Sequence, residues 1–258
     1  MARLSGKTVV LTGGARGQGQ CEVIALAAEG ARVVLTDVVD PVYPLPDNTE
    51  FHRLDVTSAQ DWRGFADRLR DGYGSVHGLV NNAGIVGSRG ASGRLQDVGL
   101  DDWNQLLAIN TTGPMLGIQA MAPLMTEGGS IVNISSVAGA GAHMAAGYGV
   151  SKWALRGLSR IASMELGSAG VRVNSILPGY IESPMQSDSP PHFVNAWLSL
   201  IPMGRAGTGG DVAPLVAFLL ADESSWITGA EIAVDGGTLG HAGLKVVSDA
   251  MAAEVDGA

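Results

Sequence analysis

The chain has 258 residues, 46% of them hydrophobic, which is enough for one large core, so a single domain over residues 1–258 is expected. The formal net charge is -9 and the 16 Lys and Arg residues are scattered, which leaves no basic patch for a nucleic acid or an anionic membrane. The N-terminus has no apolar leader, and no apolar run reaches the roughly 18 residues of a membrane span. The lone Cys21 cannot form an internal disulfide. We therefore expect a cytoplasmic protein with a small-molecule partner.

Short apolar runs, often β-branched, alternate with helix-length segments along the chain. We predict strands at residues 8–11, 32–36, 77–80, 130–134, 172–177 and 231–234, and helices at 18–29, 59–70, 100–125 and 145–166. Strands that alternate with helices form parallel sheets covered by helices on both faces. The predicted fold class is therefore α/β, with a single doubly wound parallel sheet of about seven strands.

The first strand-to-helix turn is rich in glycine. Residues 12–19 read Thr-Gly-Gly-Ala-Arg-Gly-Gln-Gly. Such a turn points backbone N–H groups and the positive end of a helix dipole at an anion, and its glycines let a pyrophosphate approach the main chain. A tight structural turn uses the same residues, so the placement between a strand and a helix is what favours a dinucleotide site.

Asp37 ends the second predicted strand, 18 residues after the last glycine of the turn. At this spacing a carboxylate hydrogen-bonds the ribose diol of NAD and repels the 2′-phosphate of NADP. Arg16 argues the other way, because its guanidinium could pair with that phosphate, but the three residues after Asp37 add no second cation. We therefore expect NAD; the alternative for Asp37 is a helix N-cap or turn aspartate.

Tyr148 and Lys152 are four residues apart in a predicted helix, so both project from the same face. The ordinary pKa of tyrosine is about 10, and a cation close by lowers it, so Lys152 could make Tyr148 a proton-transfer group. Solvated helix faces carry such pairs too. A catalytic role for Tyr148 and Lys152 is favoured by Ser135-Ser136 at the end of strand 130–134, because open α/β sheets bind ligands at the carboxyl ends of their strands.

Over essentially its whole length the chain resembles a short-chain dehydrogenase/reductase. The resemblance rests on ordered motifs at residues 12–19, Asp55-Val56, Asn81-Asn-Ala-Gly84, Asn110, Asn133-Ile-Ser-Ser136, Tyr148-x-x-x-Lys152, Pro178-Gly179 and Asp235-Gly-Gly237. Residues 148–159 and 202–205 are most similar to bacterial hydroxysteroid dehydrogenases that act at the 3-alpha or 20-beta position. The resemblance implies a Rossmann-type fold, hydride transfer between NAD and a hydrophobic secondary alcohol or its ketone, and a homotetramer built on helices 112–125 and 145–166.

The resemblance also implies a role for each motif. Tyr148 exchanges a proton with the substrate oxygen, Lys152 lowers the pKa of the tyrosine and holds the nicotinamide ribose, and a serine hydroxyl polarises the substrate oxygen. Asn110, which alone would be a polar residue in a helix interior, supports a proton relay through Lys152. Asn81 or Asn82 could instead pin the central strands. The expected cofactor contacts are Gly13, Arg16, Gly17, Gln18, Gly19, Asp37, Val38, Asp55, Val56, Asn82, Ala83, Gly84, Tyr148, Lys152, Pro178, Gly179, Ile181 and Ser183; no metal site is predicted.

Two positions depart from the family pattern. The usual spacing before the tyrosine selects Ser135, whereas motif position selects Ser136; we expect Ser136 and a one-residue deletion in the loop 138–146, because a changed strand register would flip the side chains. Ser183 stands where many relatives carry threonine, and its hydroxyl can make the same hydrogen bond.

The substrate is less well determined. Residues 183–210 have the length of a lid, and their apolar side chains would suit a bulky alcohol such as a steroid or would be ordinary packing residues: Phe193, Trp197, Leu198, Leu200 and Ile201. The loop 86–98 is a second candidate wall. Two other functions stay open, an NADP-dependent carbonyl or acyl-carrier reductase, which Arg16 permits, and a catalytically silent nucleotide-sensing protein.

Overall fold

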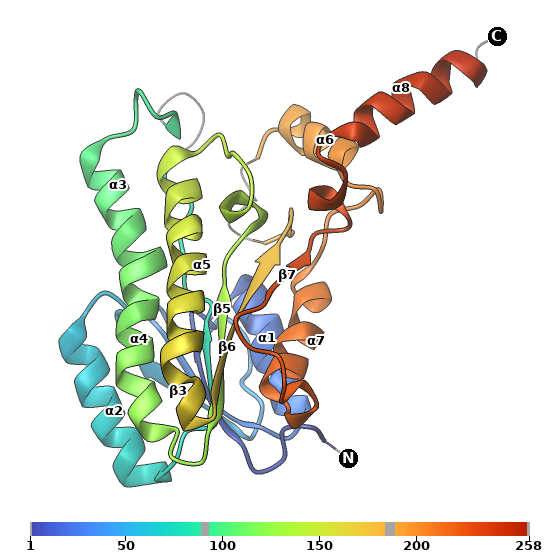
Figure 1. Ribbon diagram of the computed structural model, residues 1–258. Helices are drawn as coiled ribbons and strands as arrows, with labels where there is room; N and C mark the ends of the chain where they lie inside the picture. Colours follow the sequence, from blue (N-terminus) through green and yellow to red (C-terminus); the bar gives the residue numbers. More distant parts are fainter. Residues whose placement is uncertain (1, 89–92, 184–188, 257–258) are drawn as a thin grey trace.

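A sheet of seven parallel strands runs through the centre of the molecule (Figure 1). The computed structural model describes residues 2–88, 93–183 and 189–256. The strand order is β3-β2-β1-β4-β5-β6-β7, which confirms the predicted doubly wound α/β sheet. The strands are β1 (Thr8–Thr12), β2 (Arg32–Asp37), β3 (Thr49–Arg53), β4 (Gly78–Asn81), β5 (Gly129–Ile134), β6 (Val171–Pro178) and β7 (Glu231–Val234).

Helices cover both faces of this sheet, as expected from the alternation of elements (Figure 1). The helices α1 (Gly17–Ala28) and α7 (Gly209–Leu220) pack together on one face, and α2 (Ala59–Tyr73), α4 (Gly113–Met121) and α5 (Ala146–Leu166) lie on the other. Each face has its own apolar core, because successive strand residues point to opposite sides: Leu11 of β1 faces α1 and α7, whereas Val10 faces α2 and α4.

The predicted helix 100–125 is wrong as a single element. The structure has α3 (Leu100–Leu107), a π-helical turn (Ala108–Thr112), α4 and a 3₁₀ turn (Ala122–Leu124). The physical reason is Pro114, which has no N–H to donate to the carbonyl of Asn110 four residues back. The chain instead makes a wider turn, in which Gly113 N bonds Ala108 O.

Four elements lie outside the predicted strands and helices: β3, α6 (Pro191–Leu200), α7 and α8 (Leu244–Asp256). The strand β3 lies at the edge of the sheet, and its sequence, Thr-Glu-Phe-His-Arg, buries only its first residue, so no apolar run marks it. The helix α8 follows the last strand and projects from the body beside α6 (Figure 1). No helix in the described ranges is long and apolar enough to cross a bilayer.

Candidate active site

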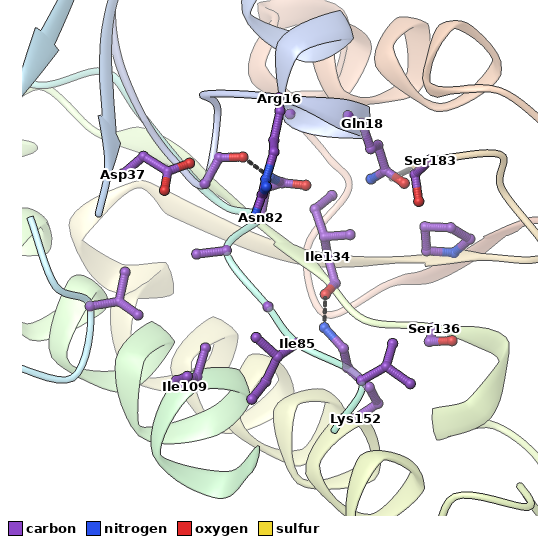
Figure 2. A pocket seen from close by; sticks show the side chains of 18 of the residues that line it. Arg16, Gln18, Asp37, Asn82, Ile85, Ile109, Ile134, Ser136, Lys152 and Ser183 are labelled. Atoms are coloured by element: carbon purple, nitrogen blue, oxygen red, sulfur yellow. Dashed lines mark hydrogen bonds between the residues drawn. The ribbon is translucent and has the colours of Figure 1, made fainter. Parts of the chain in front are cut away.

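A cavity of about 560 Å³ opens at the carboxyl ends of the central strands, where the strand order changes direction (Figure 2). Its lining comes from the turn after β1, the ends of β2, β5 and β6, the loop after β4, and α5. Every residue expected to contact the cofactor lies in this lining, together with Ser136. The other lining residues are Leu54, Ile85, Val86, Gly87, Ile109, Ile134 and Ser135.

The glycine-rich turn is shaped by close backbone packing. Gly13 has φ +72°, and a Cβ there would lie 2.6 Å from the Cα of Ala83; a Cβ at Gly19 would collide with the carbonyl oxygen of Gly13. In the described part of the chain Arg16, at the N-cap of α1, gives the first turn no side-chain hydrogen bond. The positive end of the helix is therefore left for an anion in the cavity.

The carboxylate of Asp37 is held by backbone amides at the end of β2. Oδ2 accepts a hydrogen bond from Ala15 N at 3.1 Å, and Oδ1 accepts from the amides of the next two residues, at 2.7 Å and 3.3 Å. This arrangement ties Asp37 to the glycine-rich turn, from which the exposed Arg16 also reaches the cavity (Figure 2). An acidic and a basic side chain thus both line this end of the cavity.

Lys152 is buried at the other end of the cavity. Its Nζ donates to the carbonyl oxygen of Ile134 at 2.8 Å and lies 5.8 Å from the ring centroid of Tyr148, one turn away on α5 (Figure 2). The residue is 4% exposed, and this burial lowers the pKa of its ammonium to about 8. A cation is therefore fixed beside the phenol ring, as the four-residue spacing predicts.

Asn110 lies behind the lining, fully buried in the π-helical turn. Its Oδ1 accepts from Ile85 N at 2.9 Å, and its Nδ2 donates to Ile85 O at 2.9 Å and to Ser151 Oγ at 3.0 Å. Ser151 Oγ in turn donates to Tyr148 O at 2.8 Å. Asn110 therefore joins the loop after β4 to the turn of α5 that carries the tyrosine.

The two candidate serines differ in how their hydroxyls are used. Ser135 Oγ donates to the backbone carbonyl of Lys152 at 3.0 Å and is buried against Gly139. Ser136 Oγ accepts from Ala138 N at 3.1 Å, capping a short 3₁₀ turn, which leaves its proton for another acceptor. Both line the cavity, but the hydroxyl proton of Ser135 is already committed to the protein.

The last residue of β4, Asn81, and the residue after it, Asn82, connect the central strands. Asn81 Nδ2 donates to Asn133 Oδ1 at 2.7 Å, and Asn133 Nδ2 donates to Ser159 Oγ at 2.8 Å, so β4, β5 and α5 share one buried network. Asn82 Nδ2 donates to the carbonyl oxygens of Thr12 at 3.1 Å and of the next residue at 2.9 Å, which joins the same loop to β1. These bonds fix the floor of the cavity.

The predicted lid, residues 183–210, is described except for residues 184–188, which lie outside the described chain. Ser183 lines the cavity. In α6, the ring of Trp197 stacks on that of Tyr180 with centroids 6.0 Å apart, and Phe193 meets Tyr180 at 6.4 Å in a T-shaped contact. Ile201 is buried. Of the second predicted wall, residues 86–98, Val86 and Gly87 line the cavity and residues 89–92 lie outside the described chain.

Three side chains near the site were missed from the sequence. His143 packs its ring 5.5 Å from that of Tyr148. Glu22 is fully buried and bonds Gln18, which lines the cavity. Arg53 of β3 bonds the carbonyl oxygen of Val38 and reaches the surface near Asp37. Two of these residues had a signal in the sequence: His143 stands in a loop close to Tyr148, and Glu22 stands on an apolar helix face. Arg53 had none, because it lies in β3, the strand that was not predicted.

The sequence matches a family profile described as enoyl-(acyl carrier protein) reductase over residues 13–238. The chain is 42% identical over 245 residues to a 3-alpha-(or 20-beta)-hydroxysteroid dehydrogenase of Mycobacterium tuberculosis, which covers 92% of this chain and 91% of that protein. It is 37% identical over 251 residues to a trans-4-hydroxycyclohexanecarboxylate dehydrogenase of Sinomonas cyclohexanicum, with 91% and 93% covered.

A third relative is the 3-oxoacyl-(acyl-carrier-protein) reductase FabG of Thermotoga maritima, 35% identical over 246 residues, with 91% of this chain and 98% of that protein covered. Among solved structures, the crystal structure of gox2181 superposes with a TM-score of 0.85 at 30% identity and covers 92% of this chain and 97% of that one. The likeness therefore extends over the whole sheet and its helices.

Proposed function

The chain belongs to the short-chain dehydrogenase/reductase family of oxidoreductases, and we propose that it uses NAD to interconvert a hydrophobic secondary alcohol and its ketone. The observation that carries this proposal is the placement of a buried ammonium, Lys152, beside Tyr148 and Ser136 at one end of a cavity whose other end presents the carboxylate of Asp37. A proton-transfer group and a diol-binding group then serve one elongated ligand.

The residues present fit a dinucleotide. Glycine at 13 and 19 lets the turn pack tightly against the neighbouring backbone, which brings the first residues of α1 to the cavity. Asp37, whose carboxylate is held by backbone amides, can also accept from ligand hydroxyls. When bound, NAD supplies hydride transfer at the nicotinamide C4. Asp55 and Val56 would flank the adenine, and Pro178, Gly179 and Ile181 would cover the nicotinamide.

The preference for NAD over NADP follows from charge. A 2′-phosphate placed near Asp37 would face a carboxylate that backbone amides hold in position, so the repulsion could not be relieved by rotation of the side chain. Arg16 would attract the same phosphate, but its side chain is exposed and screened by solvent. We therefore assign NAD as the preferred cofactor.

In this proposal Tyr148 exchanges the proton. In the oxidising direction its phenolate takes the proton of the substrate hydroxyl while Ser136 Oγ donates a hydrogen bond to the same oxygen; in reduction Tyr148 gives the proton back. Lys152, held by Ile134 O, stabilises the phenolate and is placed to bond the nicotinamide ribose. Asn110 fixes the turn of α5 that carries Tyr148, through Ser151.

The proposed substrate is a bulky cyclic alcohol, with a hydroxysteroid as the first candidate. Two relatives are described as dehydrogenases of a hydroxysteroid and of a hydroxycyclohexane carboxylate, so ring alcohols recur among the similar proteins. The proposed lid, residues 183–210, adds apolar side chains, with α6 anchored on Tyr180 by Trp197. An apolar wall of this kind would bury a fused-ring skeleton.

An NADP-dependent reductase of carbonyl or acyl-carrier substrates is the second candidate. Arg16 in the cavity lining favours it, because its guanidinium could pair with a 2′-phosphate. Arg53, which bonds the carbonyl oxygen of Val38, adds a second cation near Asp37, where residues 38–40 have none. The resemblance to FabG points the same way. Asp37 stands against it for the electrostatic reason given above.

A homotetramer is proposed as the assembly. In the isolated chain, α5 exposes Trp153, Ile161 and Met164, whose spacing puts them on one side of the helix. An apolar stripe of this kind on a long helix suits pairing with the same helix of a second copy.

The cytoplasmic location expected from the lone cysteine stays a prediction.

The test is a matrix of two cofactors and several alcohols. Purified protein is mixed with NAD or NADP and with steroid, cyclic and aliphatic secondary alcohols, and the absorbance of the reduced nicotinamide is followed. Turnover with NAD and a hydroxysteroid or another ring alcohol is expected. Turnover with NADP alone would favour the second candidate, and tight NAD binding without any turnover would favour a nucleotide sensor.

A further inference from the structure

Glu22 is a fully buried acid that the proposed chemistry does not use. It lies in the second turn of α1 with 0% of its surface exposed. Its Oε1 accepts from Gln18 Nε2 at 2.9 Å, whereas its Oε2 is buried with no hydrogen-bond partner among the described residues. A carboxylate with one bond in an apolar interior is costly, and burial accordingly raises the pKa of Glu22 to about 8.

The partner of this acid stands in the cavity. Gln18 belongs to the glycine-rich turn and, like Ser183, lines the cavity (Figure 2). Its amide nitrogen donates to Glu22, so this hydrogen bond fixes which end of the amide lies toward the acid. Glu22 is one helical turn further along α1, behind the amides that would bind phosphate.

We propose that Glu22 is a proton-linked positioning residue for the dinucleotide: it orients the Gln18 amide, and tight binding of the dinucleotide phosphates requires that its carboxyl be protonated. This inference rests on the proposed use of NAD. Phosphates at the first turn of α1 add negative charge close to Glu22, and two negative charges in a poorly solvated region repel each other. By reciprocity, bound dinucleotide favours the protonated acid and takes up a proton where the free protein is ionised.

The titratable groups on the elements packed against α1 do not account for the expected pH dependence in place of Glu22. Helix α1 packs against α7, β2 and β1. On α7, the partly exposed Asp211 accepts hydrogen bonds of 2.8 Å and 2.9 Å from the exposed Arg205. On β2, Arg32 is exposed and Asp37 is held by backbone amides. On α1 itself, burial raises the pKa of the Cys21 thiol, which lies next to Glu22. The strand β1 carries no titratable side chain.

The experiment measures binding of NADH rather than turnover. The dissociation constant is determined by calorimetry from about pH 6.5 to pH 9.5 for the wild type and for Glu22→Gln. The wild type should bind on the order of tenfold more weakly above pH 8, the size usual for coupled sites. Glu22→Gln keeps the hydrogen-bonding size without the charge, so most of that loss should disappear. Any remaining pH dependence belongs to Lys152 or Cys21, which both forms share.

Two further measurements separate charge from structure. Gln18→Leu removes the amide but keeps the acid, so NADH should bind more weakly while the pH dependence remains. The infrared carbonyl band of a protonated carboxylic acid should fade in the free wild type near pH 8 and persist to higher pH with NADH bound; this readout needs no variant to fold. Equal pH dependence in the wild type and Glu22→Gln, or a band unaffected by NADH, would overturn the inference. Failure of the wild type to bind NADH at any pH would instead overturn the proposed function.

Discussion

At the Tyr148 end of the cavity, buried side chains bond to one another and to carbonyls, whereas at the Asp37 end a carboxylate bonds to backbone amides near the surface. Lys152, Asn110 and Ser135 are all less than 5% exposed, and their bonds join α5 to β5 and to the loop after β4. Asp37 is partly exposed, and the neighbouring Arg16 is exposed.

This difference indicates how each end responds to change. Removing a group from the buried network alters the reacting atoms or the packing that holds them, so large effects on turnover or stability are expected. Removing a group from the Asp37 end alters a charge that discriminates between cofactors, so preference should move while the chemistry persists. The predictions below test this contrast, from the largest expected effect to the smallest.

Tyr148→Phe should produce the largest effect. The variant keeps the ring that Lys152 and His143 pack against but removes the hydroxyl, so turnover should fall by about 10²- to 10⁴-fold, the contribution of a positioned acid or base. Steady-state kinetics and NADH calorimetry measure the two quantities together. Binding of NADH should change little. Retained turnover would show that another group moves the proton and would remove the contrast between the two ends.

The paired serines give the next largest effect. Ser136→Ala should lower turnover by about 10²- to 10³-fold, as loss of a donor to a charged oxygen does. Ser135→Ala removes a buried bond to the carbonyl oxygen of Lys152, so it should cost about 1 kcal/mol of unfolding free energy and leave turnover within a fewfold of the wild type. Kinetics and urea unfolding on both variants compare them directly. The reverse pattern would assign the role to Ser135.

Asp37→Asn tests the other end. The amide keeps an oxygen that can accept from Ala15 N but loses the charge, so the ratio of kcat/KM for NAD to that for NADP should fall by about 10- to 100-fold. Turnover at saturating NAD should stay close to that of the wild type. Arg16→Ala is the matched control, and it should weaken the use of NADP alone. A collapse of turnover in Asp37→Asn would mean that this end is coupled to the chemistry.

The sequence predicts much of the fold and site because their causes are local. Apolar runs mark buried strands, the four-residue spacing puts Tyr148 and Lys152 on one face, and the glycines of residues 12–19 are required by contacts such as that of Gly13 with Ala83. The strand β3 escaped prediction because an edge strand buries little, and the break in helix 100–125 depends on a single proline.

Other features depend on contacts that no local pattern records. The sequence places Glu22 on an apolar helix face, but its full burial depends on the packing of α1 against α7. The choice between Ser135 and Ser136 turns on which hydroxyl meets the carbonyl of Lys152, a contact between β5 and α5. The aromatic contacts of α6 with Tyr180 likewise join residues from separate elements. Prediction from sequence therefore ends where tertiary contacts decide the environment of a side chain.

Lys152→Met should change the stability of the fold with the opposite sign from Ser135→Ala: the variant should be more stable than the wild type. Burial lowers the pKa of Lys152 from 10.5 to about 8, so below pH 8 the folded chain keeps a charged ammonium in a poorly solvated site. Relative to the unfolded chain, this burial of charge lowers the stability of the fold by at most about 3 kcal/mol. Methionine fills a similar volume without that charge but gives up the bond to Ile134 O, worth about 1 kcal/mol. The net gain at pH 7 should be about 1–2 kcal/mol, with turnover lost.

The pH dependence gives the sign of this prediction. From about pH 8 to pH 10.5 the folded wild type has released the proton while the unfolded chain still binds it, so wild-type stability rises over that window and the advantage of Lys152→Met shrinks. Urea unfolding at pH 7 and at pH 10 measures both differences, and Arg63→Met, on the exposed side of α2, controls for loss of a surface charge. If Lys152→Met is less stable than the wild type at pH 7, the Lys152 ammonium stabilises the fold. The charge proposed to assist Tyr148 would then also hold α5 against β5 at the buried end of the cavity.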